Sequence, residues 1–352
     1  MCASKVCKTK FIRRGEYHLK LFNDLLSPPH KAFGSKTITV PSVLNLFIAL
    51  GAYGLAIYFL WAATHYQSWY LKALFAVGFG LVGNTIFSLL HESVHRIFHH
   101  NKSVNDVFGQ FSALFFPTGF HFQRAFHLGH HRRNRTDVEL FEQYAPGDSK
   151  LLKFAQLYTV LLGFYWTSAP LGGIFYIFSP SMLKGSLFRS QHPWMKAMSM
   201  DAMLSGLDKA SAPRIRFELV ITLLFQVALF AVLKLSFLSW LLCYWSFAVM
   251  WGSLQYADHA WSVRDIRQGA WNLKVNKFIH WVFLHYHHHL AHHQHPYVPW
   301  LHLHKFVDSE KEKPSHVSIW LKMWKGPTPV QQANPLKLET DFESALYHGL
   351  KD

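Results

Sequence analysis

The chain has 352 residues, and its 35 Lys and Arg against 20 Asp and Glu give a formal net charge of +15 with histidine neutral. Hydrophobic residues make up 50% of the chain and charged residues only 16%, whereas a typical soluble domain carries about 25% charged residues. This composition argues against a disordered protein and a simple soluble domain, and the three cysteines (Cys2, Cys7, Cys243) exclude a disulfide framework.

The first segment, residues 1–40, is rich in Lys and Arg, and no apolar run begins before position 41. A secretory signal needs an apolar run directly after its basic residues. We therefore expect a basic cytoplasmic arm here.

Four apolar runs follow, in two pairs. Residues 43–63 are uncharged and long enough for one helical crossing of about 30 Å of hydrocarbon. Residues 73–90 form the second run, after a short polar and aromatic turn typical of a membrane interface. Residues 219–233 and 235–257 are separated only by Lys234, a side chain that can extend to the interface. The sequence therefore predicts two transmembrane helical hairpins.

A further uncharged run, 155–180, contains Pro170, Gly172 and Gly173, which interrupt a helix. The segments 121–135 and 264–277 are basic, as is the arm, so the positive-inside rule assigns all three to the cytoplasmic side. The second hairpin already supplies two crossings between these segments. The run at 155–180 is then re-entrant, interfacial or two short legs, and we favour a re-entrant or interfacial segment.

Histidine is the outlier of the composition, with 25 residues, and it clusters just beyond the predicted hairpins. His91 and His95 have i, i+4 spacing, which brings both imidazoles to one helix face about 6 Å apart. Two further clusters combine i, i+3 and i+4 spacing: His127, His130 and His131, and His289, His292 and His293. Imidazole suits iron, zinc and copper, and eight histidines exceed what one tetrahedral zinc ion can use. The clusters therefore predict two metal ions.

Residues 41–305 resemble the membrane fatty acid desaturase and hydroxylase superfamily, whose signature is an HxxxH or HxxxxH box followed by two HxxHH boxes. The flanking segments are similar as well: NDVFG at 105–109, HRRNRTD at 131–137 and PYVPW at 296–300. The resemblance implies an all-α integral membrane protein, with two transmembrane hairpins, the re-entrant or interfacial segment and a cytoplasmic helical cap that holds two non-haem irons. It divides the chain into the arm, this domain and a cytoplasmic C-terminal tail, 306–352.

The resemblance also implies a ninth ligand. His259 lies 30 residues before His289, where structurally known members have a histidine at the end of the last span. Gln255, one turn earlier, stands where such enzymes use an asparagine to hold a water molecule beside the metal, so that role is open here. Ligating imidazoles commonly contact neighbouring carboxylates or amides. The candidates for such contacts, each equally compatible with a solvated loop, are Glu92, Asn134, Asp137 and Asp258.

The third box has two possible registers, because His285, His288 and His289 also satisfy HxxHH. The register at 289, 292 and 293 is preferred, since Pro296 then falls three residues after the last ligand, as in the superfamily. The remaining histidines are expected beside the ligands or at the surface: His99, His100, His121, His287, His295, His302 and His304.

The activity implied by the resemblance is O₂-dependent oxidation of an unactivated C–H bond in a fatty acyl lipid, thioester or free fatty acid, with desaturation as the first expectation. Hydroxylation, or oxidative decarboxylation to a terminal alkene, would use the same boxes. The chain has no HPGG motif of cytochrome b5, so an external ferredoxin, rubredoxin or cytochrome is expected to supply electrons. The HxxxH first box resembles bacterial branches, which favours a multi-pass protein of a bacterial inner membrane. A membrane metal-binding or transport protein is the alternative, and no nucleic-acid module is expected.

Overall fold

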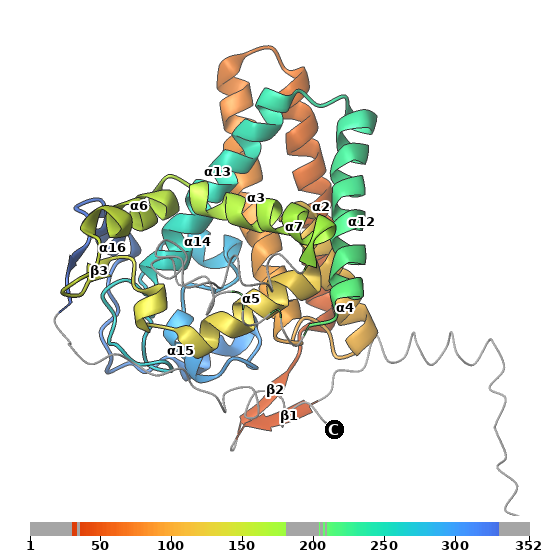
Figure 1. The fold of residues 1–352 in the computed structure, drawn as a ribbon. Coiled ribbons are helices and arrows are strands. Elements are labelled where there is room, and N and C mark those ends of the chain that lie inside the picture. The colour runs from red at the N-terminus through yellow and green to blue at the C-terminus, as the bar shows by residue number, and fades with distance from the viewer. Residues whose placement is uncertain (1–29, 34–35, 181–203, 205–206, 208–209, 331–352) are drawn as a thin grey trace, which may run out of the picture.

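The structure is a computed structural model that describes residues 30–33, 36–180, 204, 207 and 210–330 (Figure 1). Most of the predicted N-terminal arm and the last part of the predicted C-terminal tail therefore lie outside the described residues.

Within the described residues, four long helices are apolar enough to cross a membrane: α2 (Ser42–His65), α3 (Trp69–Val94), α12 (Ala212–Leu233) and α13 (Phe237–Ala257). They coincide with the four apolar runs of the sequence. Large apolar side chains such as Phe47 and Val232 are more than two-thirds exposed on them. Such a surface is suited to lipid, because a soluble protein would cover or replace so many apolar side chains.

Helix α3 packs between α2 and α13, whereas α12 packs against α4 (Lys102–Phe115), α5 (Phe120–Arg133) and α7 (Ser168–Phe178) (Figure 1). Glycine permits a close contact between α3 and α13, because a Cβ at Gly83 would lie 2.8 Å from the ring of Phe247. The turn between α2 and α3 and the turn between α12 and α13 meet at one end of the bundle. There, His65 Nε2 lies 2.9 Å from the carbonyl oxygen of Leu233. The first histidine box lies at the opposite end of α3, and the other two boxes lie on separate elements near that end.

The uncharged run at 155–180 is broken, as its sequence predicts. Helix α6 (Lys150–Leu161) is followed by a 3₁₀ turn, η2 (Phe164–Thr167), and by α7 (Ser168–Phe178), and the two halves are bent by 88°. The break lies at Gly163, in the left-handed region at φ 79°, rather than at Pro170. Pro170 falls in the first turn of α7, where a missing N–H costs little because those donors have no helical partner.

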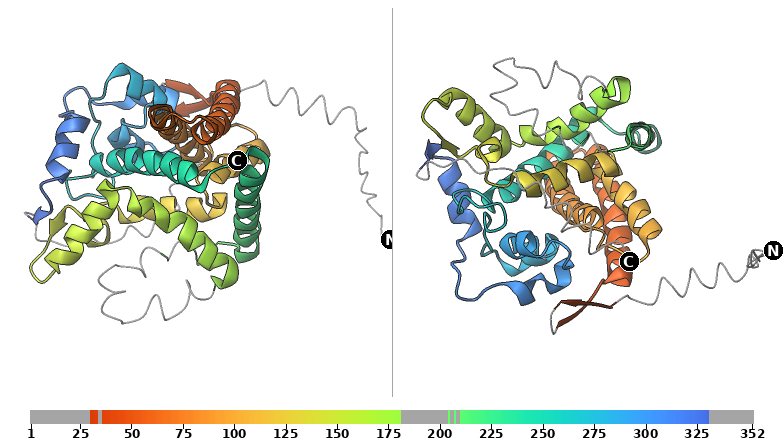
Figure 2. Two further views of the ribbon diagram at one scale, coloured as in Figure 1. Left: turned by 90° about the horizontal axis from the view of Figure 1, so that it is seen from above. Right: turned by 60° about the horizontal axis from the view of Figure 1, so that its bottom comes forward.

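Short elements form a cap beside these helices. They are η1 (Asp137–Glu139), α14 (Lys277–Val282), α15 (His289–Gln294), η4 (Trp300–Phe306), α16 (His316–Met323), an antiparallel pair β1 (His30–Phe33) and β2 (Lys36–Thr39), and a parallel pair β3 (Gln143–Tyr144) and β4 (Thr328–Pro329). In both views of Figure 2 the C-terminal elements, in blue, gather on one side of the molecule. The described body thus continues past residue 305, because α16 packs on α13 and β4 pairs with β3.

A buried ion pair fixes this cap to the end of α13. Glu142 is fully buried, and its carboxylate accepts hydrogen bonds from Arg135 Nη1 at 2.6 Å, the Tyr256 hydroxyl at 2.6 Å and the Trp261 backbone N–H at 3.0 Å. Arg135 follows the second histidine box, and Tyr256 lies in the last turn of α13. The network therefore sets the position of the second box relative to the helix end that precedes His259.

Candidate metal centre

Four segments supply the nine predicted histidines. His91 lies in the last turn of α3 and His95 directly follows that helix. The second box lies on α5, His259 follows α13, and α15 begins at His289. All nine are buried except His130, which is partly exposed.

Five of these histidines form a first group: His91, His95, His127, His131 and His292. Their candidate ligand atoms all lie within 4.8 Å of one another. The Nε2 atoms of His95 and His127 are 2.8 Å apart, and His292 Nε2 lies 3.1 Å from the Nε2 atoms of both His91 and His131. Imidazole nitrogens from three separate segments thus point at one small volume.

The other four histidines form a second group: His130, His259, His289 and His293. These ligand atoms also lie within 4.8 Å of one another, and the Nε2 atoms of His289 and His293 are 3.2 Å apart. The two groups are neighbours, because the ring centroids of His131 and His293 are 4.4 Å apart. The structure therefore brings all nine predicted residues together as two adjacent clusters.

Each HxxHH box is shared between the two groups. In the second box the i, i+4 pair His127 and His131 joins the first group, and His130 joins the second. In the third box the i, i+4 pair His289 and His293 joins the second group, and His292 joins the first. On a helix, residues i and i+4 differ by about 40° in direction, whereas i+3 lies about 60° to the other side of i. One box therefore contributes imidazoles to both groups.

Burial makes these imidazoles suitable ligands. It lowers the pKa of His127, His131 and His292 well below the usual histidine value, and the neighbouring histidines lower it further. Burial and the same repulsion lower the pKa of His289 and His293 in the same way. The imidazoles are therefore neutral at pH 7, and a neutral imidazole has the lone pair that a metal ion needs.

Hydrogen bonds orient two ligands of the second group. His259 Nδ1 donates to the carbonyl oxygen of Gly269 at 2.9 Å, so its Nε2 carries the lone pair. His130 Nδ1 lies 2.6 Å from Glu139 Oε2, and Glu139 also accepts from Arg133 Nε at 2.9 Å. Burial alone would raise the pKa of Glu139, but His130 and Arg133 lower it to about 2, so Glu139 is ionised.

Glu139 is not among the residues that the sequence predicts beside the imidazoles. The residue predicted there is Asp137 instead. Asp137 is 59% exposed at its side chain and pairs with Arg264 instead. The two carboxylates are separated by two positions in the 3₁₀ turn η1, where such residues point about 120° apart. The sequence does indicate that an acidic residue follows the second box. Which acidic residue faces His130 depends on the geometry of the η1 turn.

The other predicted neighbours divide between the site and its surroundings. Asp258 is buried with Oδ2 3.5 Å from His289 Nδ1, and Asn134 Nδ2 lies 3.4 Å from His293 Nδ1. Glu92 accepts from the backbone N–H of Trp300 at 3.1 Å and so anchors the segment after the third box. Gln255 accepts from the Tyr286 hydroxyl at 3.1 Å.

The histidines predicted to lie outside the ligand set contact other parts of the chain. His121 Nδ1 lies 2.7 Å from Glu218, and His302 Nε2 lies 3.0 Å from the Thr39 carbonyl oxygen. His285 and His288, which define the other register of the third box, belong to neither group.

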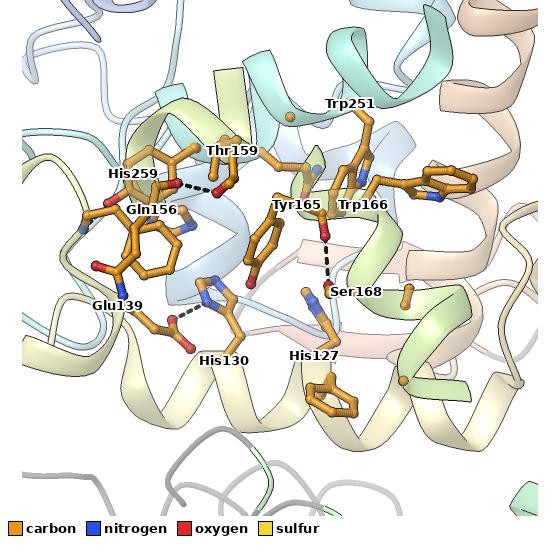
Figure 3. Close-up of a pocket in the computed structure, with 18 of the residues that line it drawn as sticks. His127, His130, Glu139, Gln156, Thr159, Tyr165, Trp166, Ser168, Trp251 and His259 are labelled. Carbon is orange, nitrogen blue, oxygen red and sulfur yellow. Dashed lines mark hydrogen bonds and ion pairs between the residues drawn. The ribbon is translucent and has the colours of Figure 1, made fainter. Parts of the chain in front are cut away.

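An apolar cavity of about 510 Å³ opens beside both groups (Figure 3). His127, His130 and His259 form part of its wall, and aromatic side chains from α5, η2 and α13 form much of the rest. Tyr165 and Trp166 enter from the bent pair α6–α7, opposite the α5 histidines in Figure 3. This is the size and character of a pocket for an apolar small molecule.

The fatty acid desaturase family model matches residues 67–321, well over half of the chain. The chain therefore belongs to the fatty acid desaturase family, whose members are membrane-bound oxidoreductases. No curated protein matches the chain.

Replacing Glu139 with Ala should lower the metal affinity of the second group about 10- to 100-fold, because His130 loses the contact that orients it. Metal bound per purified chain, measured by mass spectrometry across a chelator series, checks this. Asp137→Ala is the matched control from the same turn, and equal losses in both variants would show that Glu139 has no special role.

Proposed function

We propose that this chain oxidises an unactivated C–H bond of a fatty acyl chain at a di-iron centre in a membrane, and that the product is a double bond. One observation carries the proposal. Nine imidazoles form two adjacent groups, and His127, His130 and His259 from these groups line an apolar cavity together with several aromatic side chains.

The donor set supports iron. Both groups offer imidazole nitrogen, a ligand suited to iron, zinc and copper, and the separation into two groups suits two ions rather than one. Two bound irons would supply O₂ activation and the oxidising power for C–H cleavage, chemistry that side chains alone do not provide. The protein residues around the two groups orient the imidazoles and keep most of them away from water.

The cavity supports an acyl substrate. Phe87, Phe116 and Trp251 line its wall together with Tyr165 and Trp166 of the bent pair, and such rings bind a hydrocarbon chain without hydrogen-bonding to it. Because His127 belongs to the first group and His259 to the second, a methylene in this cavity lies beside both groups. Desaturation is the reaction after which the family is named.

Lipid and volatile-hydrocarbon profiles of a host that expresses the full chain should contain new double bonds in acyl chains, and the pure protein should hold two irons. His259→Ala should abolish the product and lower iron content, because the second group loses one of four ligands. His302→Ala, outside both groups, should leave both unchanged. A hydroxylated or decarboxylated product would replace desaturation as the proposed reaction. Metal uptake into vesicles without lipid oxidation would refute the proposal that the protein is an enzyme.

Gly172→Leu should shift the products toward shorter acyl chains by at least two carbons. Gly172 lines the cavity, and a Cβ there would lie 3.6 Å from the ring of Phe122, so a larger side chain takes up cavity volume. Gly54→Leu is the control, because Gly54 is exposed on α2 and a Cβ there meets nothing within 4 Å. An unchanged chain-length profile in Gly172→Leu would remove this cavity as the substrate site.

We also propose that the metal groups face the cytoplasm. The interhelical turns and the cap are at opposite ends of α3 and α13, and the cap exposes Lys274, Lys277 and Lys311. By the positive-inside rule this favours a cytoplasmic cap, and a basic surface suits docking of an acidic ferredoxin, rubredoxin or cytochrome. The bent pair α6–α7 would then be a re-entrant segment over the cavity.

Single cysteines at Ser68 and Lys274, both exposed, should react with an impermeant thiol reagent from opposite sides of sealed vesicles. Both single-cysteine variants also carry Cys2→Ser and Cys7→Ser. Cys243 is kept, because it is buried and inaccessible to the reagent. Labelling of Lys274→Cys from outside intact cells would overturn the cytoplasmic cap.

A further inference from the structure

A third group of imidazoles lies between α14 and α15, outside the nine already described. His280 on α14 and His287 and His288 in the following turn have ligand nitrogens within 4.8 Å of one another. The preferred registers of the three boxes do not include them, and the sequence predicts His287 beside the ligands or at the surface. His287 is buried, while His280 and His288 are partly exposed.

The closest pair in this group has the same nitrogen–nitrogen separation as one pair in the main centre. His280 Nδ1 lies 2.8 Å from His287 Nε2, the same separation as between His95 and His127. His287 Nδ1 donates to the carbonyl oxygen of Leu273 at 2.8 Å, so the proton of its neutral ring is on Nδ1. Its Nε2 therefore presents a lone pair toward His280.

Unpartnered nitrogens surround this pair. His288 Nδ1 is buried without a hydrogen-bond partner, and so are both ring nitrogens of His285, whose side chain is almost fully buried. The ring of His285 stacks on that of His280, with centroids 3.8 Å apart. Buried polar atoms without partners are rare in folded proteins, because each loses its hydrogen bonds to water. A bound cation would give the lone pairs of this group a partner.

The backbone of the turn is also held in an unusual form. Leu284 and His285 both have positive φ, 43° and 55°, a region that residues other than glycine rarely adopt. Two such residues in succession cost conformational free energy, and such conformations cluster at functional sites. The turn carries His287 and His288 back toward α14, which is the arrangement that brings the three imidazoles together.

We propose that His280, His287 and His288 bind a third metal ion, a divalent transition ion of the zinc type. Three imidazoles with an open fourth position occupied by water form a well-known zinc coordination set, and the partial exposure of His280 and His288 leaves room for that water. The ion ties α14 to the residue directly before His289. Its role is to hold the third box in position, and the proposal stands whatever reaction the main centre performs.

The test counts metal ions on the full-length protein in detergent. After Zn²⁺ is added and the excess removed, the wild type should hold one more metal ion per chain than the double variant His280→Gln/His287→Gln. The variant's apparent affinity for this last Zn²⁺ should fall more than about tenfold, since two of three ligands are lost. His302→Gln is the matched control, a half-buried histidine with one backbone contact that belongs to none of the three groups.

Equal metal counts in the wild type and the double variant, or an equal loss in the control, would overturn the proposal. If the double variant does not fold, anomalous scattering from wild-type crystals at the zinc edge decides. A peak between α14 and His288, separate from the main centre, supports the site, and its absence after Zn²⁺ soaking refutes it.

Discussion

The gathering of nine imidazoles in one place, eight of them buried, is the constraint on which the rest of the structure depends. Burial strips water from their nitrogens, and nitrogens of neighbouring rings lie only 2.8–3.2 Å apart. The hydrogen bond to the Gly269 carbonyl oxygen holds the proton of His259 on Nδ1, so its Nε2 carries a lone pair. Without a cation between them such lone pairs repel one another. The cap is therefore best understood as a scaffold that holds this otherwise unfavourable cluster in place.

The scaffold depends on the membrane helices as well as on the cap. Helix α3 carries His91 in its last turn and packs between α2 and α13. The packing of α3 against these two helices therefore fixes the position of His91, and with it the first group, relative to the helix bundle. The end of α13 sets the position of His259, and Glu142 links that end to the residues after the second box. A buried ion pair with one partner removed costs about 3–5 kcal/mol, which makes this link resistant to change. Helix packing and metal geometry are thus coupled through a few fixed contacts.

Local signals in the sequence predict the helices and eight of the nine histidines, whereas His259 is implied only by the resemblance to the superfamily. An uncharged run of sufficient length predicts a spanning helix, and i, i+3 and i+4 spacing brings imidazoles to one face. The division into two groups was not predictable, because it depends on how α5 and α15 face each other. His130 and His292 each leave their own box partners and join the opposite group. The choice of Glu139 over Asp137, and the break at Gly163, likewise depend on turn geometry that residue types alone do not determine.

His130 and His292 each belong to a different group from the other two histidines of their box. The two groups are therefore linked through shared helices, as two separate sites would not be. Each HxxHH helix contributes to both groups, so a displacement of α5 or α15 moves imidazoles of both groups together. The cavity lies against both groups, because its wall includes His127 from the first group and His130 and His259 from the second. Tyr165 and Trp166 of η2 line the same cavity. The same interlocking that holds the imidazoles against their mutual repulsion therefore also fixes both groups relative to this cavity.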